Sequence, residues 1–322
     1  MRGTAISAAL GALLLVAARV HPASTGVTFE KGDNRIDVNI DGKPFTTYYY
    51  ASDLPRPFFH PVRAADGRVV TRGFPMIADA PGEAKDRDHT HHRALWFTHG
   101  DVDGVDYWGE AAKVQGRIVH RSIDTLSAGK RGVLAVTRDW IDNTGRKTLV
   151  EKEEVAFQGD ATRRIVDFRI DLRPAEGAVV FRDTKEGSFA IRLATPLKEQ
   201  NGGAITNSRG AVGEKSCWGK PADWVDYSGT LDGAKLGVAI MDHPASFRHP
   251  TTWHVRAYGL FAANPFGLRD FTRDKSQDGS YRLEPGKHLV LRYRVLVHPG
   301  GTAEANIAAE YQRYLQEVKQ VR

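Results

Sequence analysis

Strict alternation of apolar and charged residues is the feature that most constrains how this chain folds. In the segment VDFRIDL (166–172), four apolar side chains fall on one face of an extended backbone and three charged ones on the other. The segment LVLRYRVLV (289–297) repeats the pattern, with every odd-numbered position apolar. A period of two indicates antiparallel strands with one face on a core and the other toward water or a polar groove.

Comparable segments, separated by turns such as Asp41-Gly42 and Asn143-Thr144-Gly145, predict strands along most of the chain. The expected strands are 27–50 (as a hairpin), 68–71, 94–97, 116–125, 132–141, 147–157, 166–172, 188–194, 224–228, 236–241, 253–258 and 288–298. Helical spacing appears only near the end, at 302–319, where Ile307, Tyr311, Leu315 and Val318 form an apolar stripe. We therefore expect an all-β protein, a large antiparallel β-sandwich with one C-terminal helix, and a single domain over residues 24–322.

The beginning of the chain has the features of an export signal. Arg2 precedes the apolar segment AISAALGALLLVAA (5–18), which is too short to span a membrane as a helix. We expect a signal peptide over residues 1–23 and a periplasmic or secreted mature protein. No later segment is apolar enough to cross a bilayer, so integral membrane association is not expected.

Charge and cysteine content narrow the function classes. The 45 Lys and Arg residues are scattered, and they exceed the 39 Asp and Glu residues only enough to give a net charge of +6. Without a basic cluster or aromatic nucleic-acid motif, nucleic acid is not expected as a partner. The single cysteine, Cys217, cannot form an intramolecular disulfide, and we expect it to be a buried structural thiol.

Residues 86–108, DRDHTHHRALWFTHGDVDGVDYW, form the densest cluster of reactive groups, with four of the twelve histidines. If His89-Thr90-His91 is extended, both imidazoles project from one face and could act as adjacent metal ligands. His99, His243 or Glu186 would then supply a third ligand. The alternative interpretation is a polar, hydrogen-bonded turn at the start of a strand.

Charged groups later in the chain supply further candidates. Lys185-Glu186 is either a general acid/base pair or an exposed charge pair. In 253–258, His254 and Arg256 share a face that would line a polar groove, where Arg256 could bind a carboxylate or hydroxyls. Tryptophans beside these segments, Trp253 among them, would suit the apolar face of a sugar, although tryptophans in sandwiches are more often core residues.

Several of these segments resemble one bacterial family. The block Asp88-His89-Thr90-His91-His92-Arg93-Ala94-Leu95-Trp96, followed by His99-Gly100-Asp101, is similar to the family's DHPHHRGLWF-x-HGDVNG motif. Thr90 and Ala94 depart from its proline and glycine. Later blocks also match in order, at 184–187, 218–220, 224–229, 242–244, 253–256 and 264–267. The family is of unknown function, and its members are often labelled "methane oxygenase PmoA".

The resemblance implies a sugar-related role and a β-supersandwich of the galactose-mutarotase kind. We expect the PmoA label to be a misnomer, because the methane monooxygenase subunit is an integral membrane protein and this mature chain has no transmembrane segment.

Three hypotheses about function follow. The first is an exported enzyme that acts on a carbohydrate by acid–base chemistry, as an epimerase, lyase or hydrolase would. The second is a metal-dependent enzyme with His89 and His91 as ligands of a divalent cation; no other cofactor is indicated. The third is a non-catalytic carbohydrate-binding protein. The expected catalytic residues are His89, His91, His92, Arg93, His99, Lys185 and Glu186. The expected substrate-binding residues are His60, His243, His249, Trp253, His254, Arg256 and Asn264.

Overall fold

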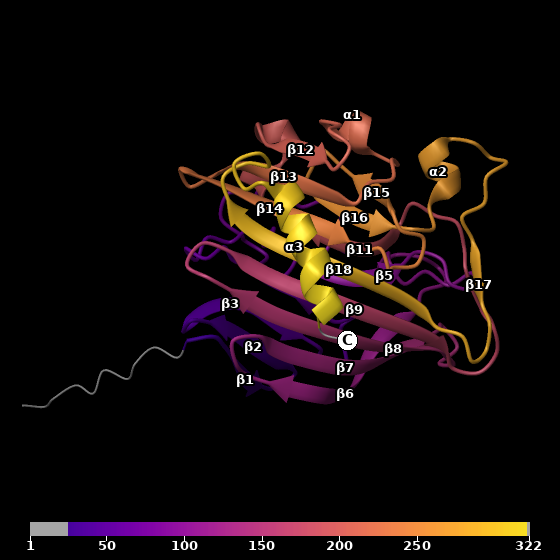
Figure 1. Cartoon of the computed structure of the whole chain (residues 1–322). Helices are drawn as coiled ribbons and strands as arrows, with labels where there is room; N and C mark the ends of the chain where they lie inside the picture. Colours follow the sequence, from indigo (N-terminus) through magenta and orange to yellow (C-terminus); the bar gives the residue numbers. More distant parts are fainter. Residues whose placement is uncertain (1–24, 321–322) are drawn as a thin grey trace, which may run out of the picture.

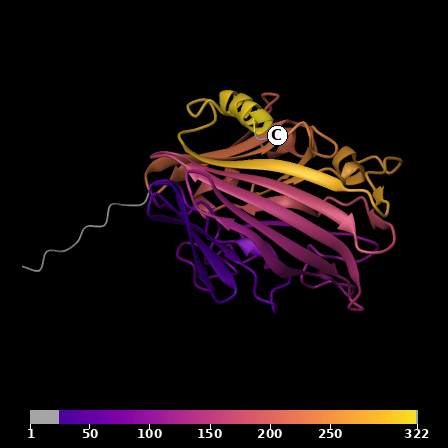
Figure 2. The ribbon, with the colours of Figure 1, turned by 60° about the horizontal axis from the view of Figure 1, so that its bottom comes forward.

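A computed structural model describes residues 25–320 and shows two large antiparallel sheets packed face to face (Figures 1 and 2). The all-β sandwich expected from the alternating segments is confirmed. The expected signal peptide at 1–23 lies outside the described residues.

The first sheet has eight strands in the order β1-β2-β3-β4-β5-β11-β16-β15. Their bounds are β1 Val27–Gly32, β2 Arg35–Ile40, β3 Lys43–Tyr49, β4 Phe58–Phe59, β5 Leu95–His99, β11 Gly187–Arg192, β16 Leu260–Asn264 and β15 Thr252–Val255. The sheet therefore brings together strands from both ends of the chain, because β11 pairs with β5 on one side and with β16 on the other.

The second sheet also has eight strands, in the order β12-β13-β14-β18-β9-β8-β7-β6. Their bounds are β12 Ala204–Asn207, β13 Trp224–Leu231, β14 Ala234–Asp242, β18 Leu289–Pro299, β9 Arg164–Pro174, β8 Lys147–Gly159, β7 Gly132–Ile141 and β6 Arg117–Ser127. A two-stranded sheet pairs β10 (Val179–Phe181) with β17 (Tyr281–Leu283).

The core lies between the two large sheets, on the faces that the alternation predicts. Val166, Phe168 and Ile170 of β9 belong to the same buried cluster as Leu291 and Tyr293 of β18. The first sheet contributes the alternate positions of its central strands, such as Phe97 and Phe189. Its opposite face, which we call the outer face of the first sheet, carries the residues between them and is available to the loops.

The C-terminal helix α3 (Ile307–Gln320) lies on the outer side of the second sheet (Figures 1 and 2). Ile307, Tyr311 and Tyr314 pack there against Met241 and Leu296. The predicted packing of the apolar stripe on a sheet is confirmed, although the helix begins at Ile307 rather than at 302. The side chain of Val318 lies outside the described residues.

The predicted strands differ from the structure where local patterns were short. Residues 68–71 form isolated bridges at Val69 and Thr71 rather than a strand. β15 ends at Val255, and β4, β10, β12, β16 and β17 were not predicted. β16 lacks alternation because all five of its residues are buried. Four short helices were also missed: α1 (Glu214–Cys217), α2 (Leu268–Thr272) and the 3-10 turns Thr195–Leu197 and Glu199–Asn201.

Cys217 is buried, and its thiol donates to the carbonyl of Ala211 at 3.3 Å. Burial, reinforced by Glu199, raises the pKa of the thiol to about 11. At pH 8 only about a thousandth of it would be thiolate, the reactive form. We therefore expect a thiol reagent to react very slowly with the native protein and to titrate one thiol per chain in denaturant. A disulfide-linked dimer under denaturing, non-reducing conditions would contradict this assignment.

Candidate functional site

The histidine cluster is a tight turn rather than an extended segment. The amide of His92 donates to the carbonyl of His89 at 3.0 Å, and His89 has a left-handed backbone with φ of +47°. The expected extended conformation of His89-Thr90-His91 is therefore wrong, and the alternative, a hydrogen-bonded turn before the strand, is correct. The turn brings the imidazoles of His89, His91 and His92 together. An extended segment would place the His92 ring on the opposite face from the other two.

The rings of this turn form a stack on the outer face of the first sheet. Tyr258 stacks on His89 with centroids 5.1 Å apart, His89 on His92 at 4.7 Å, and His92 on Trp96 at 5.4 Å. The His91 ring meets the His89 ring edge-on at 5.6 Å. Exposure falls along the stack, because the His89 side chain is 39% exposed and His92 is only 1% exposed. His89 thus forms its accessible end, with His91 beside it.

Two fully buried arginines fix the turn from below. Arg72 donates to the carbonyls of Asp88 and His89, both at 2.9 Å, and to Oδ1 of Asp88 at 2.7 Å. Arg192 of β11 donates to the same Oδ1 at 2.7 Å and to Oδ1 of Asp86 at 2.9 Å. Its other nitrogen lies 3.2 Å from Nδ1 of His92, which must be unprotonated to accept. Such charge-assisted bonds hold the backbone of the turn in one geometry.

Asp86 completes this network. Its Oδ2 accepts hydrogen bonds from Nζ of the buried Lys198 and from the hydroxyl of Thr195 at 2.7 Å. Burial alone would raise the pKa of Asp86, but Lys198, Thr195 and Arg192 lower it. The carboxylate therefore stays ionised and balances the positive charges beneath the turn.

Asp88 and His89 form an exposed carboxylate–imidazole pair. Oδ2 of Asp88 lies 2.6 Å from Nδ1 of His89, and both side chains are about 40% exposed, at 44% and 39%. Burial opposes the charge on Asp88, but Arg192, the hydrogen bond from His89 and Arg72 lower its pKa. An ionised Asp88 accepts the Nδ1 proton and leaves Nε2 of His89 for another partner.

His91 is half-buried, and its carbonyl accepts a hydrogen bond from the buried Arg56 at 2.7 Å. Burial, Arg56 and His89 lower the pKa of His91 to about 4, against an opposing effect of Glu186. Its ring is therefore neutral near pH 7 and can accept a proton or a hydrogen bond. The influence of Glu186 places that carboxylate within electrostatic reach of the turn.

Arg93, an expected catalytic residue, makes a bidentate pair with Glu110, both bonds being 2.9 Å long. Its guanidinium also lies over the ring of Phe58, 5.8 Å from the centroid. The Arg93 side chain therefore links the turn to the loop that contains Glu110 and has a structural role.

The Lys185-Glu186 loop, residues 182–186, is held by three side chains that the sequence suggested as site residues. Nε2 of His99 bonds to the carbonyl of Arg182 at 2.8 Å, the amide of Asn264 to that of Thr184 at 2.9 Å, and Nδ1 of His254 to that of Lys185 at 2.9 Å. Each of the three is no more than 3% exposed. They position the loop from the strands below it.

This arrangement separates positioning residues from reactive ones. Burial lowers the pKa of His99 to about 4 and that of His254 to about 3, so both rings are neutral. The loop they hold presents Lys185 and Glu186, whose side chains form an ion pair and are 40% and 35% exposed. His99 and His254 therefore act on the site through the loop rather than by touching a ligand.

Four other expected binding residues do not join the turn. Trp253 lies in the core between the sheets, 0% exposed, with Nε1 donating to the carbonyl of Ala222 at 2.9 Å. His249 bonds to Asp242 at 2.9 Å, and His243 packs on Tyr314 of α3. His60 is buried beside β4. Contacts with a substrate at the turn are therefore not expected from these residues.

Arg256 lies between the turn and a neighbouring pocket. Its guanidinium carbon is 5.4 Å from the centroid of Tyr258, which itself stacks on His89, and it pairs with Glu214 at 3.3 Å. Arg256 follows the end of β15, and its side chain is 36% exposed, whereas His254, which was expected to share its face, is 3% exposed.

Sequence reasoning missed the buried support of the turn: Arg56, Arg72, Arg192 and Lys198. The available signal was a charged residue in an apolar strand, since Arg192 follows the apolar Phe189-Ala190-Ile191 of β11. Such a residue predicts a buried partner, although the sequence alone did not identify Asp86 and Asp88 as that partner.

A metal site was the alternative for His89 and His91. Among residues 25–320, no group of three or more His, Cys, Asp or Glu side chains is placed to hold a metal ion. His99 and His243, two of the suggested third ligands, contact Phe266 and Tyr314 instead of the turn. The donor set among the described residues does not fit a three-ligand site.

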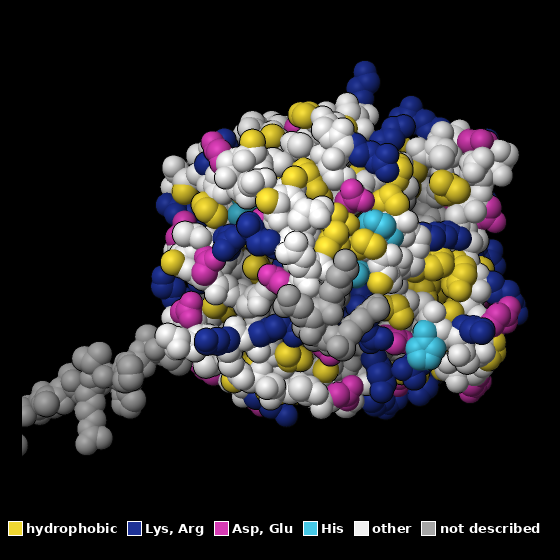
Figure 3. Space-filling view, in the orientation of Figure 1, with side chains coloured by type: hydrophobic (Ala, Val, Ile, Leu, Met, Phe, Trp, Pro, Cys, Tyr) yellow, Lys and Arg dark blue, Asp and Glu magenta, His cyan; other side chains and the backbone are white. Residues whose placement is uncertain are grey.

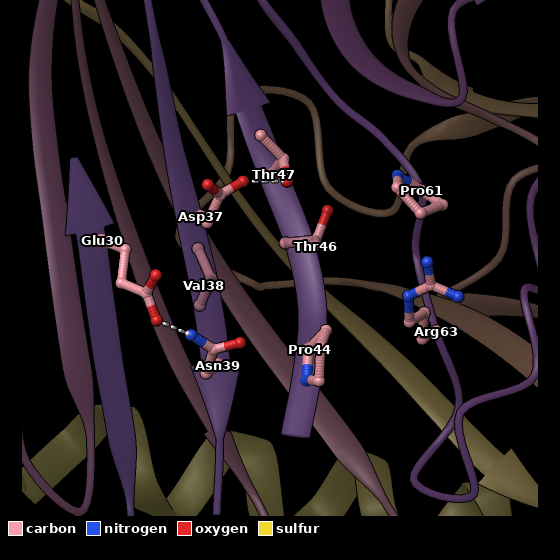
Figure 4. Close-up of a pocket in the computed structure, with 9 residues that line it drawn as sticks. All are labelled: Glu30, Asp37, Val38, Asn39, Pro44, Thr46, Thr47, Pro61 and Arg63. Atoms are coloured by element: carbon pink, nitrogen blue, oxygen red, sulfur yellow. Dashed lines mark hydrogen bonds between the residues drawn. The ribbon is translucent and has the colours of Figure 1, made fainter. Parts of the chain in front are cut away.

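A small pocket of about 340 Å³ opens where β2 and β3 meet residues 61–63 (Figure 4). Glu30 and Asn39, which line it, hydrogen bond to each other at 3.0 Å, and none of the expected site residues lines it. On the face shown in Figure 3, Lys and Arg side chains are interspersed with Asp and Glu. No helix within residues 25–320 has the length and apolar character needed to span a membrane.

The structure thus defines a large antiparallel β-sandwich that carries a histidine turn and a charged loop on the outer face of one sheet. Residues 35–312 match the sequence family described as "Family of unknown function (DUF6807)". The chain belongs to this family, in agreement with the expected membership of a family of unknown function; that description does not include the label PmoA. No curated protein matches the chain.

Two solved structures are similar over 85% of this chain. The "galactosidase domain of alpha-galactosidase-sucrose kinase, AgaSK" shares 12% identity, with a TM-score of 0.38 and 42% of its own chain covered. The "Crystal structure of beta-arabinopyranosidase" shares 14%, with a TM-score of 0.29 and 38% covered. This chain thus spans less than half the length of either structure.

Proposed function

We propose that this protein is an exported enzyme that acts on a carbohydrate by proton transfer at the histidine turn. The observation that carries the proposal is the exposed Asp88–His89 pair, with its 2.6 Å hydrogen bond, beside the neutral ring of His91. The apolar amino-terminal segment (5–18) supports export.

His89 is the proton acceptor in this proposal. Asp88 holds the Nδ1 proton and stabilises the imidazolium that forms when Nε2 takes a second proton from a substrate hydroxyl or carbon acid. Arg72 and Arg192 keep Asp88 ionised and fixed, so that the ring need not reorient during the transfer. Rigid support of this kind is what proton transfer between positioned groups requires.

Glu186 is the second proton-transfer group. It lies within electrostatic reach of His91 and Tyr258 and is paired with Lys185. The three buried side chains beneath the loop fix the backbone at Lys185. A carboxylate and an imidazole on either side of a bound ring would let one group accept a proton and the other return it. Tyr258, stacked on His89, and the partly exposed Arg256 beside it supply an aromatic ring and hydrogen-bond donors for sugar hydroxyls.

The test begins with a thermal-shift screen of neutral saccharides, uronic acids and keto-sugars, followed by activity assays on each hit. We expect His89→Asn to lower kcat/KM at least about a hundredfold, the lower end of what general acid–base groups contribute. Asparagine is chosen because it tolerates the left-handed backbone at this position. His288→Asn is the matched control, since Nδ1 of His288 also bonds an aspartate, Asp171, at 2.9 Å on the second sheet.

Three outcomes would overturn the proposal. If no saccharide of the panel binds, the substrate is not a carbohydrate of these classes. Binding without turnover by the wild-type protein would favour the non-catalytic sugar-binding alternative. Activity that is lost with a chelator and restored by a divalent cation, with metal found in the purified protein, would favour the metal-dependent alternative.

A further inference from the structure

Arg256, which contacts Tyr258 beside the histidine turn, also lines a pocket of about 720 Å³. Its lining is Glu199, Val212, Gly213, Glu214, Lys215, Ser216, Trp218, Arg256 and Arg273. The mechanism proposed above uses none of these residues for proton transfer. The pocket has the size of a small-molecule site and combines an aromatic side chain with charged groups.

The charges of this pocket are unequally satisfied. Both carboxylates are engaged by the protein, since Glu199 accepts from the amide of Glu214 at 3.1 Å and Glu214 accepts from the amide of Ala257 and pairs with Arg256. In the described part of the chain, no carboxylate pairs with Lys215 or with the guanidinium of Arg273. Arg273 instead lies over the ring of Trp218, 5.9 Å from its centroid. Glu199 has no cationic partner among the described residues, but the three cationic side chains of the lining outnumber its two carboxylates, so the net charge of the lining is positive.

The apolar part of the lining comes from Trp218 and Val212. Val212 is 63% exposed, which is unusual for a valine and leaves its methyl groups open to a ligand. Trp218 is half-buried, whereas the other five tryptophans are each no more than 7% exposed. Trp218 is thus the tryptophan of this chain that a ligand can reach.

Two side-chain contacts link the lining of the pocket to the proposed reaction site. Arg256 lines the pocket and lies over Tyr258, and Tyr258 stacks on His89. A ligand with one sugar ring at His89 would extend its next ring toward Arg256.

From these observations we infer that the pocket binds a carboxylate-bearing sugar unit, a uronate, adjacent to the unit that reacts at His89. The inference rests on the proposed function and names its substrate class: an acidic oligosaccharide. Arg256, Arg273 and Lys215 surround the carboxylate, and arginine matches a carboxylate in bidentate geometry. Trp218 and Val212 cover the apolar face of the ring.

Isothermal titration of the full mature chain with a uronate disaccharide and with its neutral, carboxyl-reduced counterpart tests the inference. We expect the uronate to bind at least about tenfold more tightly, since a hydrogen bond to a charged group contributes about 1.5–3 kcal/mol. Arg273→Met and Lys215→Met should each weaken uronate binding about tenfold or more and leave the neutral disaccharide unaffected. Both side chains are exposed, so neither change should impair folding.

Lys275→Met is the matched control, because it removes the same charge from the same loop as Arg273 but lies outside the pocket. It should bind the uronate like the wild type. The inference would be overturned if the acidic and neutral disaccharides bound with equal affinity. It would also be overturned if neither Arg273→Met nor Lys215→Met weakened uronate binding. Inorganic phosphate that binds as tightly as the uronate would overturn it too, since the pocket would then recognise an anion rather than a sugar.

The His89→Asn variant distinguishes failure of the pocket from failure of the proposed function. Turnover of a neutral disaccharide that depends on His89, with no preference for uronates, would sustain the proposed function and overturn the pocket assignment. Uronate binding that requires Arg273, without turnover by the wild type, would sustain the pocket and overturn the proposed function.

Discussion

The protein should unfold in mild acid, before the pH falls to 4. Four histidines, each no more than 4% exposed, are held neutral in the folded state: His60, His92, His99 and His254. Burial lowers the pKa of His60 and His99 to about 4 and that of His254 to about 3, and it holds the pKa of His92 well below 6.5.

Whether acid raises or lowers the free energy of unfolding depends on which state, folded or unfolded, binds more protons. Below the ordinary histidine pKa of 6.5, the unfolded chain protonates these four imidazoles and the folded chain does not. Their contribution to stability is therefore complete above pH 6.5 and is lost as the pH falls toward their folded pKa values near 4. Each group lowers the free energy of unfolding by about 1.4 kcal/mol per pH unit in this window, so four together remove roughly 5 kcal/mol per unit.

A domain is typically stable by about 5–15 kcal/mol, so this loss reaches its whole stability within two to three pH units. Urea unfolding followed by tryptophan fluorescence at a series of pH values measures the slope. Replacing His60 by leucine should reduce the slope of the free energy of unfolding against pH by about 1.4 kcal/mol per unit, the contribution of one proton. Nδ1 of His60 has no hydrogen-bond partner to lose among the described residues. A free energy of unfolding that stays flat from pH 7 to 5 would contradict the assignment of neutral buried imidazoles.

Replacing Arg138 by methionine should lower the free energy of unfolding by about 3–5 kcal/mol, the usual effect of removing one partner from a buried ion pair. Arg138 of β7 points into the sandwich interior, 2% exposed, where it donates to Glu151 at 3.0 Å and to Glu153. It also donates to the hydroxyl of Tyr48 from the opposite sheet, at 3.2 Å. Without Arg138, both carboxyl groups would be buried without a counter-charge.

Chemical denaturation at pH 7 measures this effect. Arg282→Met is the matched control, since Arg282 pairs with Glu284 and their side chains are 61% and 54% exposed, and exposed pairs contribute at most about 1 kcal/mol. Combining Arg138→Met with Glu151→Gln and Glu153→Gln should recover part of the loss, because no charge then remains in the interior. A single variant as stable as the wild type would show that the two carboxyls are already protonated in the native protein.

The two predictions concern different parts of the molecule. The Arg138 cluster lies between the sheets, where it links β3, β7 and β8. His92 lies in the histidine turn, and His99 and His254 hold the Lys185-Glu186 loop. Acid should therefore loosen the support of the site along with the fold, and activity should be lost no later than global unfolding.

The sequence alone determined the long alternating strands and which of their residues face the core. In β9 and β18 the side of each side chain follows from its position in a period of two, which depends only on the backbone of that strand. The C-terminal stripe of Ile307, Tyr311 and Leu315 likewise predicted the helix face that packs on a sheet. The density of reactive groups at 86–108 selected the segment in which the site is proposed, although the conformation of His89-Thr90-His91 was predicted wrongly.

Only the tertiary structure decided which polar groups meet. Arg192 reaches Asp86 and Asp88, about a hundred residues earlier, because β11 pairs with β5. His99 and His254 hold the Lys185-Glu186 loop because β5, β11, β16 and β15 are neighbours in the first sheet. Such contacts depend on strand order, which local periodicity does not encode. Strand order therefore also decides the roles of the histidines. His89 is left accessible as a candidate proton acceptor, whereas His99 and His254 support the Lys185-Glu186 loop.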